Sequence, residues 1–241
     1  MRKKDKTIVY EVREVPMKSG NTPLIETLYE DAYVLVAVKP QGMPSQPDPT
    51  GAPDALTLAA AGKTLYPVHR LDRMTGGVMV FARTRAAAAA LSRQFADHGT
   101  DEIGKHYLAV VAGTVPGPLT LRDDLLRDAR TGMARVVPAG SGQEARLTAS
   151  PIGYSTFSGG AVTLLEVLPE TGRFHQIRCQ LSAHGFPILG DGKYGSRARV
   201  PLALFAETLT FRHPDTGALV TFRAPRPSGG AWDAFTDCFS S

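Results

Sequence analysis

Short apolar runs of strand length dominate the chain and restrict the folds it can adopt. They combine branched and aromatic side chains over five to nine residues, as buried strands do. The runs are residues 33–38, 78–82, 105–113 and 161–168, with further strands expected in the tail from residue 202. Helical patterns are fewer and do not alternate regularly with these runs. An α+β fold is therefore favoured over a doubly wound α/β fold.

Two segments have the spacing of helices. Thr84 can cap a helix that runs towards His98, with Gly99 able to end it. Residues 174–184 predict a second helix, closed by Gly185. Neither segment repeats elsewhere, so the chain is not a repeat protein.

The length of 241 residues allows one or two domains with a substantial core. Residues 1–24 are charged, and we expect a basic arm or an edge strand there. Residues 25–241 are expected to form the main domain. The composition, 43% hydrophobic and 21% charged, is typical of globular proteins.

Charge and cysteine content bear on partners and compartment. The net charge of +4, with a pI near 9.1, permits a nucleic-acid partner without requiring one. Cys179 and Cys238 fit a reduced cytoplasmic chain better than a disulfide framework. We find no pattern for a signal peptide or a membrane span. A soluble, cytoplasmic protein without membrane contact is expected.

Residues 69–77, His-Arg-Leu-Asp-Arg-Met-Thr-Gly-Gly, form the segment that points most directly at chemistry. Asp72 lies between Arg70 and Arg73, just before an apolar strand. Nearby positive charge favours the ionised carboxylate, which can act as nucleophile or general base. The alternative is a surface salt bridge in a turn.

A second constellation spans residues 170–178 (Glu-Thr-Gly-Arg-Phe-His-Gln-Ile-Arg). Arg178 borders an apolar stripe, and a half-buried guanidinium needs an anionic partner. Asp72 is a suitable partner, although spacing alone does not bring them together. Arg173 and His175 could contact phosphate oxygens. The alternative is a solvated basic helix face.

Tyr107 follows Lys105 and His106 at the start of a predicted strand. An aromatic ring with basic neighbours could stack on a nucleobase. The alternative is a core tyrosine with a satisfied hydroxyl group.

Patterns for metals and cofactors are missing from the sequence. The six histidines show no short paired ligand spacing, and the two cysteines are far apart. There is no phosphate-binding glycine loop and no dinucleotide fingerprint. We therefore expect chemistry with no cofactor and no metal.

Taken together, these segments resemble the RluA-type family of RNA pseudouridine synthases. The match extends in order over residues 28–227. It includes the segments 29–31 and 38–43, 69–72 with 75 and 77, 105–113, 170–178, 184–191 with 194–195, 209–214 and 222–225. The resemblance implies a mixed, mainly antiparallel central sheet with flanking helices and a central active-site cleft. It makes residues 25–241 the catalytic domain, with too short a lead-in for an N-terminal S4 module.

The resemblance also implies isomerisation of uridine in RNA, with the base detached from C1′ and rejoined through C5. Asp72 becomes the catalytic carboxylate, Arg178 its ion-pair partner, and Tyr107 the ring that stacks on the target base. Arg70 would help to hold the flipped nucleotide, and Arg73, Arg173 and His175 would bind RNA. Whether Asp72 attacks C1′ or removes the C2′ proton stays open. The expected partner of this monomer is a loop or stem-loop of ribosomal or transfer RNA.

Three departures from the family pattern affect the expected RNA contacts and substrate choice. They are Gly76 in place of Ser, Cys179-Gln180 in place of Val-His, and Phe205 in place of His. Two other functions remain open. One is a non-catalytic RNA-binding protein that retains the fold; the other is a sugar hydrolase with Glu170 as second acid.

Overall fold

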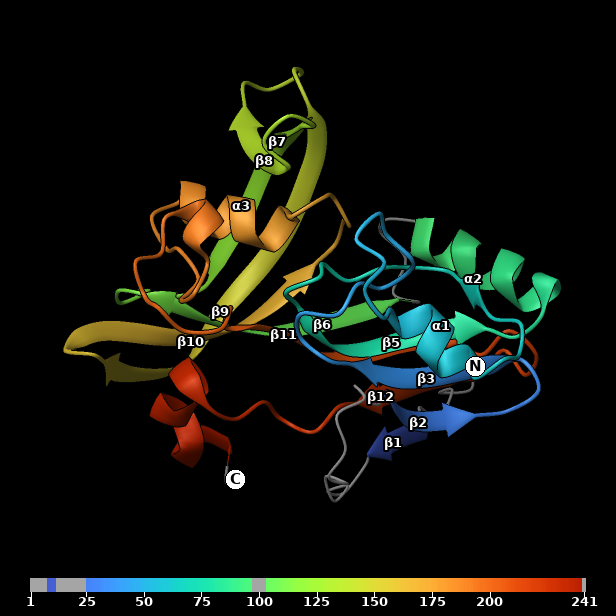
Figure 1. Cartoon of the computed structure of the whole chain (residues 1–241). Coiled ribbons are helices and arrows are strands. Elements are labelled where there is room, and N and C mark those ends of the chain that lie inside the picture. Colours follow the sequence, from blue (N-terminus) through green and yellow to red (C-terminus); the bar gives the residue numbers. More distant parts are fainter. Residues whose placement is uncertain (1–7, 12–24, 97–102, 240–241) are drawn as a thin grey trace, which may run out of the picture. The chain divides into compact units, whose positions relative to one another are not determined.

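The computed structural model describes residues 8–11, 25–96 and 103–239. These fall into two compact units (Figure 1). Unit 1 consists of Met1–Lys105 and Ala206–Pro225, and unit 2 of His106–Phe205 and Arg226–Ser241. The predicted arm over residues 1–24 lies outside the described residues, apart from Ile8–Glu11, which form a strand.

The described part of unit 1 is built mainly from strands, with two helices. Its elements are β1 (Ile8–Glu11), β2 (Glu26–Glu30), β3 (Val34–Lys39), α1 (Ala55–Ala60), β4 (Tyr66–Pro67), β5 (Gly76–Ala82), α2 (Arg85–Ala96), β11 (Leu204–Arg212) and β12 (Leu219–Arg223). The strand order is β2-β3-β5-β11, with β12 beside β11 and β4 beside β5. Strand β1 pairs parallel with β12, whereas β3 pairs antiparallel with β2 and β5.

Strands β3 and β5 form the centre of unit 1. All seven residues of β5 are buried, which explains why this strand is apolar throughout rather than alternating. Helix α1 packs against β3 and α2 against β5 (Figure 1). Thr84 caps α2 as predicted, because its Oγ1 accepts a hydrogen bond from Ala87 N at 3.1 Å. The predicted end of this helix, at His98 and Gly99, lies outside the described residues.

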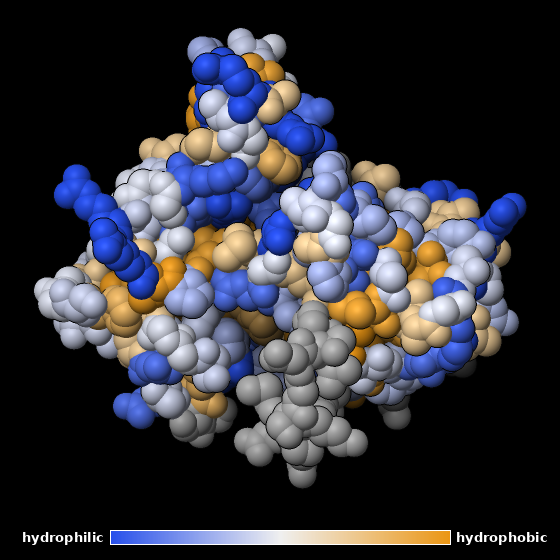
Figure 2. Space-filling model, viewed as in Figure 1, coloured by the Kyte–Doolittle hydropathy of each residue, from blue (hydrophilic) through white to orange (hydrophobic). Residues whose placement is uncertain are grey.

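The described part of unit 2 is an antiparallel sheet with one α-helix and two 3-10 helices. Its elements are β6 (Gly104–Ala112), β7 (Leu119–Asp128), β8 (Met133–Val137), β9 (Gln143–Phe157), β10 (Gly160–Pro169), α3 (Gln176–Ala183), η1 (Gly192–Tyr194) and η2 (Gly230–Phe239). The strand order is β6-β10-β9-β7-β8. Strands β7 and β8 form a hairpin, and hydrophilic side chains gather near its tip, next to a few hydrophobic ones (Figure 2).

The core of unit 2 lies between its sheet and the helices packed on it. Ile177 and Leu181 of α3 join the buried side chains of β6, β9 and β10. Trp232 and Phe235 of η2 belong to the same cluster, and η2 packs against β9. Among the described residues, strands outnumber helices in both units, so the predicted α+β class is confirmed.

The predicted helix over residues 174–184 is wrong at its start. Helix α3 begins at Gln176, because His175 adopts the left-handed conformation with φ 53°. Phe174 continues the apolar spacing of the helix beyond its first residue, so this spacing does not show where the helix begins. In the part of the chain that the structure describes, no helix has the length and apolar character needed to cross a bilayer.

Candidate active site

Asp72 lies on the loop between β4 and β5 in unit 1. The loop closes in a turn, in which Thr75 N donates to the carbonyl oxygen of Asp72 at 3.0 Å. Asp72 is half-buried, and the strand that follows is entirely buried. A carboxylate on a loop held by a rigid strand is well placed for chemistry.

Lys39, the last residue of β3, fastens this loop through hydrogen bonds of its side chain. Its side chain is 0% exposed, and Nζ donates to the carbonyl oxygens of Met43 (2.7 Å), Pro40 (3.0 Å) and Arg73 (3.2 Å). Burial lowers the pKa of Lys39 to about 7, while the charge of Asp72 acts in the opposite direction. Sequence reasoning missed this role, because a lysine before proline looks like an ordinary strand end.

The loop after β3 fastens the Asp72 loop at two further points. Ser45 Oγ donates to Leu71 O at 2.7 Å and accepts from Leu71 N at 3.0 Å. Gly42 N donates to Arg73 O at 2.9 Å. Both residues that flank Asp72 are therefore bonded through their backbone, which holds the loop on either side of Asp72.

His69 belongs to the scaffold of the same loop. Its Nε2 accepts a hydrogen bond from Val80 N at 3.0 Å, and its ring stacks on Phe95 with centroids 4.5 Å apart. Burial, with a smaller contribution from the charge of Lys105, lowers the pKa of His69 to about 3. The ring is therefore neutral at physiological pH and serves as an acceptor for β5.

The two arginines of the motif differ in their surroundings. Arg70 is exposed. Arg73 is also exposed, and its Nε donates to Gly42 O at 3.0 Å while Nη1 lies 3.7 Å from Asp48 Oδ2. Arg70 thus has a surface position, whereas Arg73 helps to fasten the loop.

Tyr107 lies on β6 in unit 2, opposite Val167 of β10. It is half-buried and packs against the core of that unit. Asp72 therefore belongs to unit 1, and Tyr107 and Arg178 belong to unit 2.

Arg178 lies on α3 and forms a buried ion pair with Asp191. Its Nε donates to Asp191 Oδ2 at 2.7 Å and its Nη2 to Oδ1 at 2.8 Å. The side chains are only 7% and 1% exposed. Within unit 2, Asp191 thus supplies the anionic partner that the sequence requires for Arg178. Sequence reasoning missed this residue, although it lies in the segment 184–191 that carries the family resemblance.

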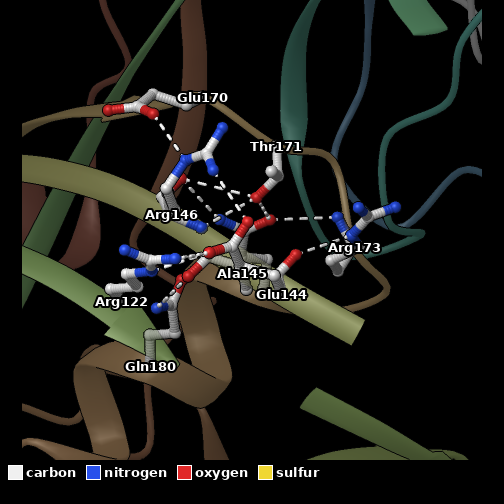
Figure 3. A network of polar contacts seen from close by, with 9 residues as sticks. Arg122, Glu144, Ala145, Arg146, Glu170, Thr171, Arg173 and Gln180 are labelled. Atoms are coloured by element: carbon white, nitrogen blue, oxygen red, sulfur yellow. Dashed lines mark hydrogen bonds and ion pairs between the residues drawn. The ribbon is translucent and has the colours of Figure 1, made fainter. Parts of the chain in front are cut away.

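A polar network fixes the segment before α3 (Figure 3). Arg146 of β9 pairs with Glu144 at 2.7 Å and with Glu170 at 2.8 Å. Arg173 Nε donates to Glu144 O at 2.9 Å. The predicted phosphate contact Arg173 is thus bonded to the backbone of β9. Glu170, the second acid of the hydrolase alternative, is paired with Arg146.

Gln176, the first residue of α3, is buried and closes this network. Its Oε1 accepts from Thr171 Oγ1 at 2.7 Å and from Arg173 N at 3.0 Å. Its Nε2 donates to Arg146 O at 2.9 Å. These bonds hold the turn that starts the helix bearing Arg178.

His175 stacks on Phe174, with ring centroids 3.9 Å apart. Its Nδ1 lies 3.0 Å from the hydroxyl oxygen of Tyr194, and Arg127 lies 4.4 Å above the Phe174 ring. Burial raises the pKa of Tyr194 to about 12. Arg178 also lies over the Tyr194 ring, so His175 and Arg178 share Tyr194 as a neighbour.

The residues that depart from the family pattern lie mostly inside the molecule. Cys179 is buried, and burial raises its pKa to about 11. Gln180 is 0% exposed and donates to Asp123 Oδ2 at 2.7 Å. Phe205 packs against the core of unit 2, and Gly76 is the buried first residue of β5. Within the described ranges, no three His, Cys, Asp or Glu side chains gather as metal ligands would.

Comparison with known proteins relates the chain to enzymes that act on RNA. The sequence pattern described as RNA pseudouridylate synthase matches residues 33–183. The chain is 37% identical over 213 residues to the dual-specificity RNA pseudouridine synthase RluA of Escherichia coli K12, with 84% of this chain and 94% of the relative covered. It is 35% identical over 232 residues to the ribosomal large subunit pseudouridine synthase D of Xanthomonas campestris pv. campestris, with 84% and 66% covered.

A solved structure has the same fold. Human RNA Pseudouridylate Synthase Domain Containing 1 is similar with a TM-score of 0.73 and 20% sequence identity. The similarity covers 93% of this chain and 98% of the human chain. At this identity the likeness concerns the fold alone, and it confirms the predicted pseudouridine synthase fold.

Proposed function

Because the chain belongs to the RNA pseudouridylate synthase family, and is thus an isomerase that converts uridine in RNA to pseudouridine, we propose that Asp72 is its catalytic carboxylate. The reaction breaks the N1–C1′ bond, joins C1′ to C5 and releases the C5 proton, while N1 takes up a proton, so the net composition is unchanged. Asp72 either attacks C1′ or removes the C2′ proton. Both routes need an ionised carboxylate in a fixed position.

The fastening of the Asp72 loop is the observation that carries this assignment. Lys39, Ser45 and Gly42 bond to the backbone on both sides of Asp72. These bonds hold the loop on both sides of the carboxylate. The positive charge of Lys39 couples to Asp72 and favours its ionised form. A preorganised carboxylate of this kind suits catalysis.

Tyr107 and Arg178 are the proposed partners of Asp72 in the active site. Tyr107 would stack on the flipped base, which returns about 1–3 kcal/mol of the cost of unstacking it. Arg178 would supply a fixed positive charge to the carboxylate. Arg70, Arg73, Arg173 and His175 are the proposed RNA contacts. Of these, Arg70 and Arg73 are exposed, which suits contacts with phosphate groups, and Arg70 could also fill the space left by the flipped base.

We assign ribosomal or transfer RNA as the substrate, at a uridine in a loop or stem-loop, where a base is easiest to unstack. The names of the relatives support this class: one is a dual-specificity enzyme, and another acts on the large ribosomal subunit. The net charge of +4 favours a polyanionic partner. We further propose that the protein is a cytoplasmic monomer and that it needs no cofactor.

The test uses transcripts of ribosomal and transfer RNA that carry tritium at uracil C5. The wild-type protein should release the label, and Asp72→Asn should reduce release by at least about a thousandfold, as expected for loss of a catalytic group. RNA binding by Asp72→Asn should stay within about threefold of wild type. Glu30→Gln, a change of an exposed acid in the same unit, should leave release unchanged.

Two results would contradict the assignment. Label release that survives in Asp72→Asn removes Asp72 from the chemistry. Salt-sensitive RNA binding without release by the wild-type protein would instead favour a non-catalytic RNA-binding protein that retains the fold.

A further inference from the structure

The ion pair between Arg178 and Asp191 has a geometry that fixes orientation as well as charge. Two parallel hydrogen bonds, of 2.7 and 2.8 Å, join the guanidinium to both carboxylate oxygens. Such a bidentate contact restrains the guanidinium plane, which a single bond does not. Because a buried ion pair contributes little net stability, its presence calls for another explanation.

The backbone around Asp191 is itself tightly held. Its carbonyl oxygen accepts from Tyr194 N at 3.0 Å and Ser196 N at 3.1 Å, and its own N–H donates to Ile188 O at 3.1 Å. Gly190 has φ +78°, and a Cβ there would lie 2.4 Å from Pro201 O. Asp191 is therefore presented from a rigid turn, as a positioning group needs to be.

Tyr194 restrains the same guanidinium from a second direction. The Cζ atom of Arg178 lies 5.0 Å from the centre of the Tyr194 ring, within the range of a cation–π contact. The hydroxyl oxygen of Tyr194 accepts from Ala134 N at 2.7 Å, which ties the ring to β8. Arg178 is thus held by a carboxylate and by an aromatic face, both from the segment 191–194.

We propose that Asp191 is a positioning residue of the pseudouridine synthase reaction, which holds the guanidinium of Arg178 in its working orientation. This inference rests on the proposed function, and specifically on the place of Arg178 in the active site. Asp191 acts through Arg178 and does not itself touch the substrate. Its replacement should therefore lower the rate of chemistry with little change in RNA affinity.

The experiment measures single-turnover release of C5 tritium at saturating RNA, together with the dissociation constant for the same RNA. Asp191→Glu keeps the charge and displaces the carboxylate by one methylene. A displacement of about 1 Å at an active site can cost on the order of a hundredfold, so we expect a rate about 10–100-fold lower. Asp191→Asn should be at least as slow, and both variants should bind RNA within about twofold of wild type.

A double-mutant cycle separates positioning from a general effect on folding. If Asp191 acts through Arg178, then Asp191→Asn should add no further loss of rate to Arg178→Lys. Asp123→Asn is the matched control, because Asp123 also bonds to a side chain of α3, Gln180, at 2.7 Å. It should leave the rate within about twofold. If Asp191→Asn does not fold, Asp191→Glu carries the comparison, since it still neutralises Arg178.

Each other outcome overturns either this inference or the proposed function. Near wild-type rates in both Asp191 variants, with a slow Arg178→Lys, overturn the inference and leave the proposed function standing. A full additional loss in the double variant, or a loss confined to RNA affinity, overturns it too. An unimpaired Arg178→Lys removes Arg178 from the site, and the inference with it. Absence of release by the wild-type protein overturns the proposed function itself.

Discussion

Lys39 places an ammonium group at the end of a strand whose other side chains are apolar. Its three acceptors match the three N–H bonds of the charged form, whereas burial favours the neutral form and lowers the pKa to about 7. The charge of Asp72 partly offsets this effect of burial. The protonation of Lys39 is therefore coupled to the loop that carries the proposed catalytic carboxylate.

This coupling predicts a pH-dependent stability. The pKa of Lys39 is about 7 in the folded protein and 10.5 ordinarily, so between these values the unfolded chain binds more protons. The free energy of unfolding should then rise with pH, by at most about 1.4 kcal/mol per pH unit. Lys39→Met should lack this rise. Urea unfolding at several pH values from 7 to 10 measures it, with the exposed Lys63→Met as control. Parallel curves for wild type and Lys39→Met would contradict the prediction.

Single residues differ in how readily their roles can be predicted from the sequence. Asp72 and Arg178 could be singled out, because a carboxylate between arginines and an arginine beside an apolar stripe both call for an explanation. Asp191 could not, since 13 residues separate it from Arg178 and only the fold brings them together. Cys179 and Gln180 depart from the family pattern at buried positions, which sequence comparison alone does not reveal.

At the scale of elements, the start of β5 depends on a close approach of two strands. Gly77 pairs with Lys39 of β3 and has φ +125°. A Cβ there would lie 2.1 Å from the carbonyl oxygen of Ala206 on β11. The strand that follows the Asp72 loop can therefore pack between β3 and β11 only with glycine at this position.

Gly77→Ala should accordingly destabilise the protein by roughly 2–5 kcal/mol, from backbone strain and overpacking together. Thermal and urea unfolding measure the loss. Gly117→Ala is the matched control, because a Cβ at Gly117 meets nothing within 4 Å. A loss below about 1 kcal/mol in Gly77→Ala would show that the strands can separate without penalty.

Strands that are continuous apolar runs, such as residues 78–82, could be predicted, because such runs have few alternatives. The start of α3 could not, because Phe174 extends the helical spacing beyond the helix itself. Its true boundary depends on bonds from Gln176 to Thr171 and Arg146. Such long-range side-chain bonds are invisible to local periodicity.

At the scale of the whole molecule, the chain passes between its two units three times, once after β12, between Pro225 and Arg226, and twice inside strands. The boundary falls between Lys105 and His106 within β6, and between Phe205 and Ala206 within β11. No change of composition marks these positions, so the division could not be predicted from the sequence. Each of the two strands takes part in both units.

Shared strands predict that the two units unfold together, because melting one unit frees an end of a strand that belongs to the other. Trp232, the only tryptophan of the chain, reports on unit 2. In the variant Trp232→Phe with Phe95→Trp, the reporter moves to unit 1. In each protein, urea transitions followed by tryptophan fluorescence and by far-UV circular dichroism should coincide. A fluorescence transition displaced from the circular dichroism curve in either protein would show that the units unfold independently, despite the strands they share.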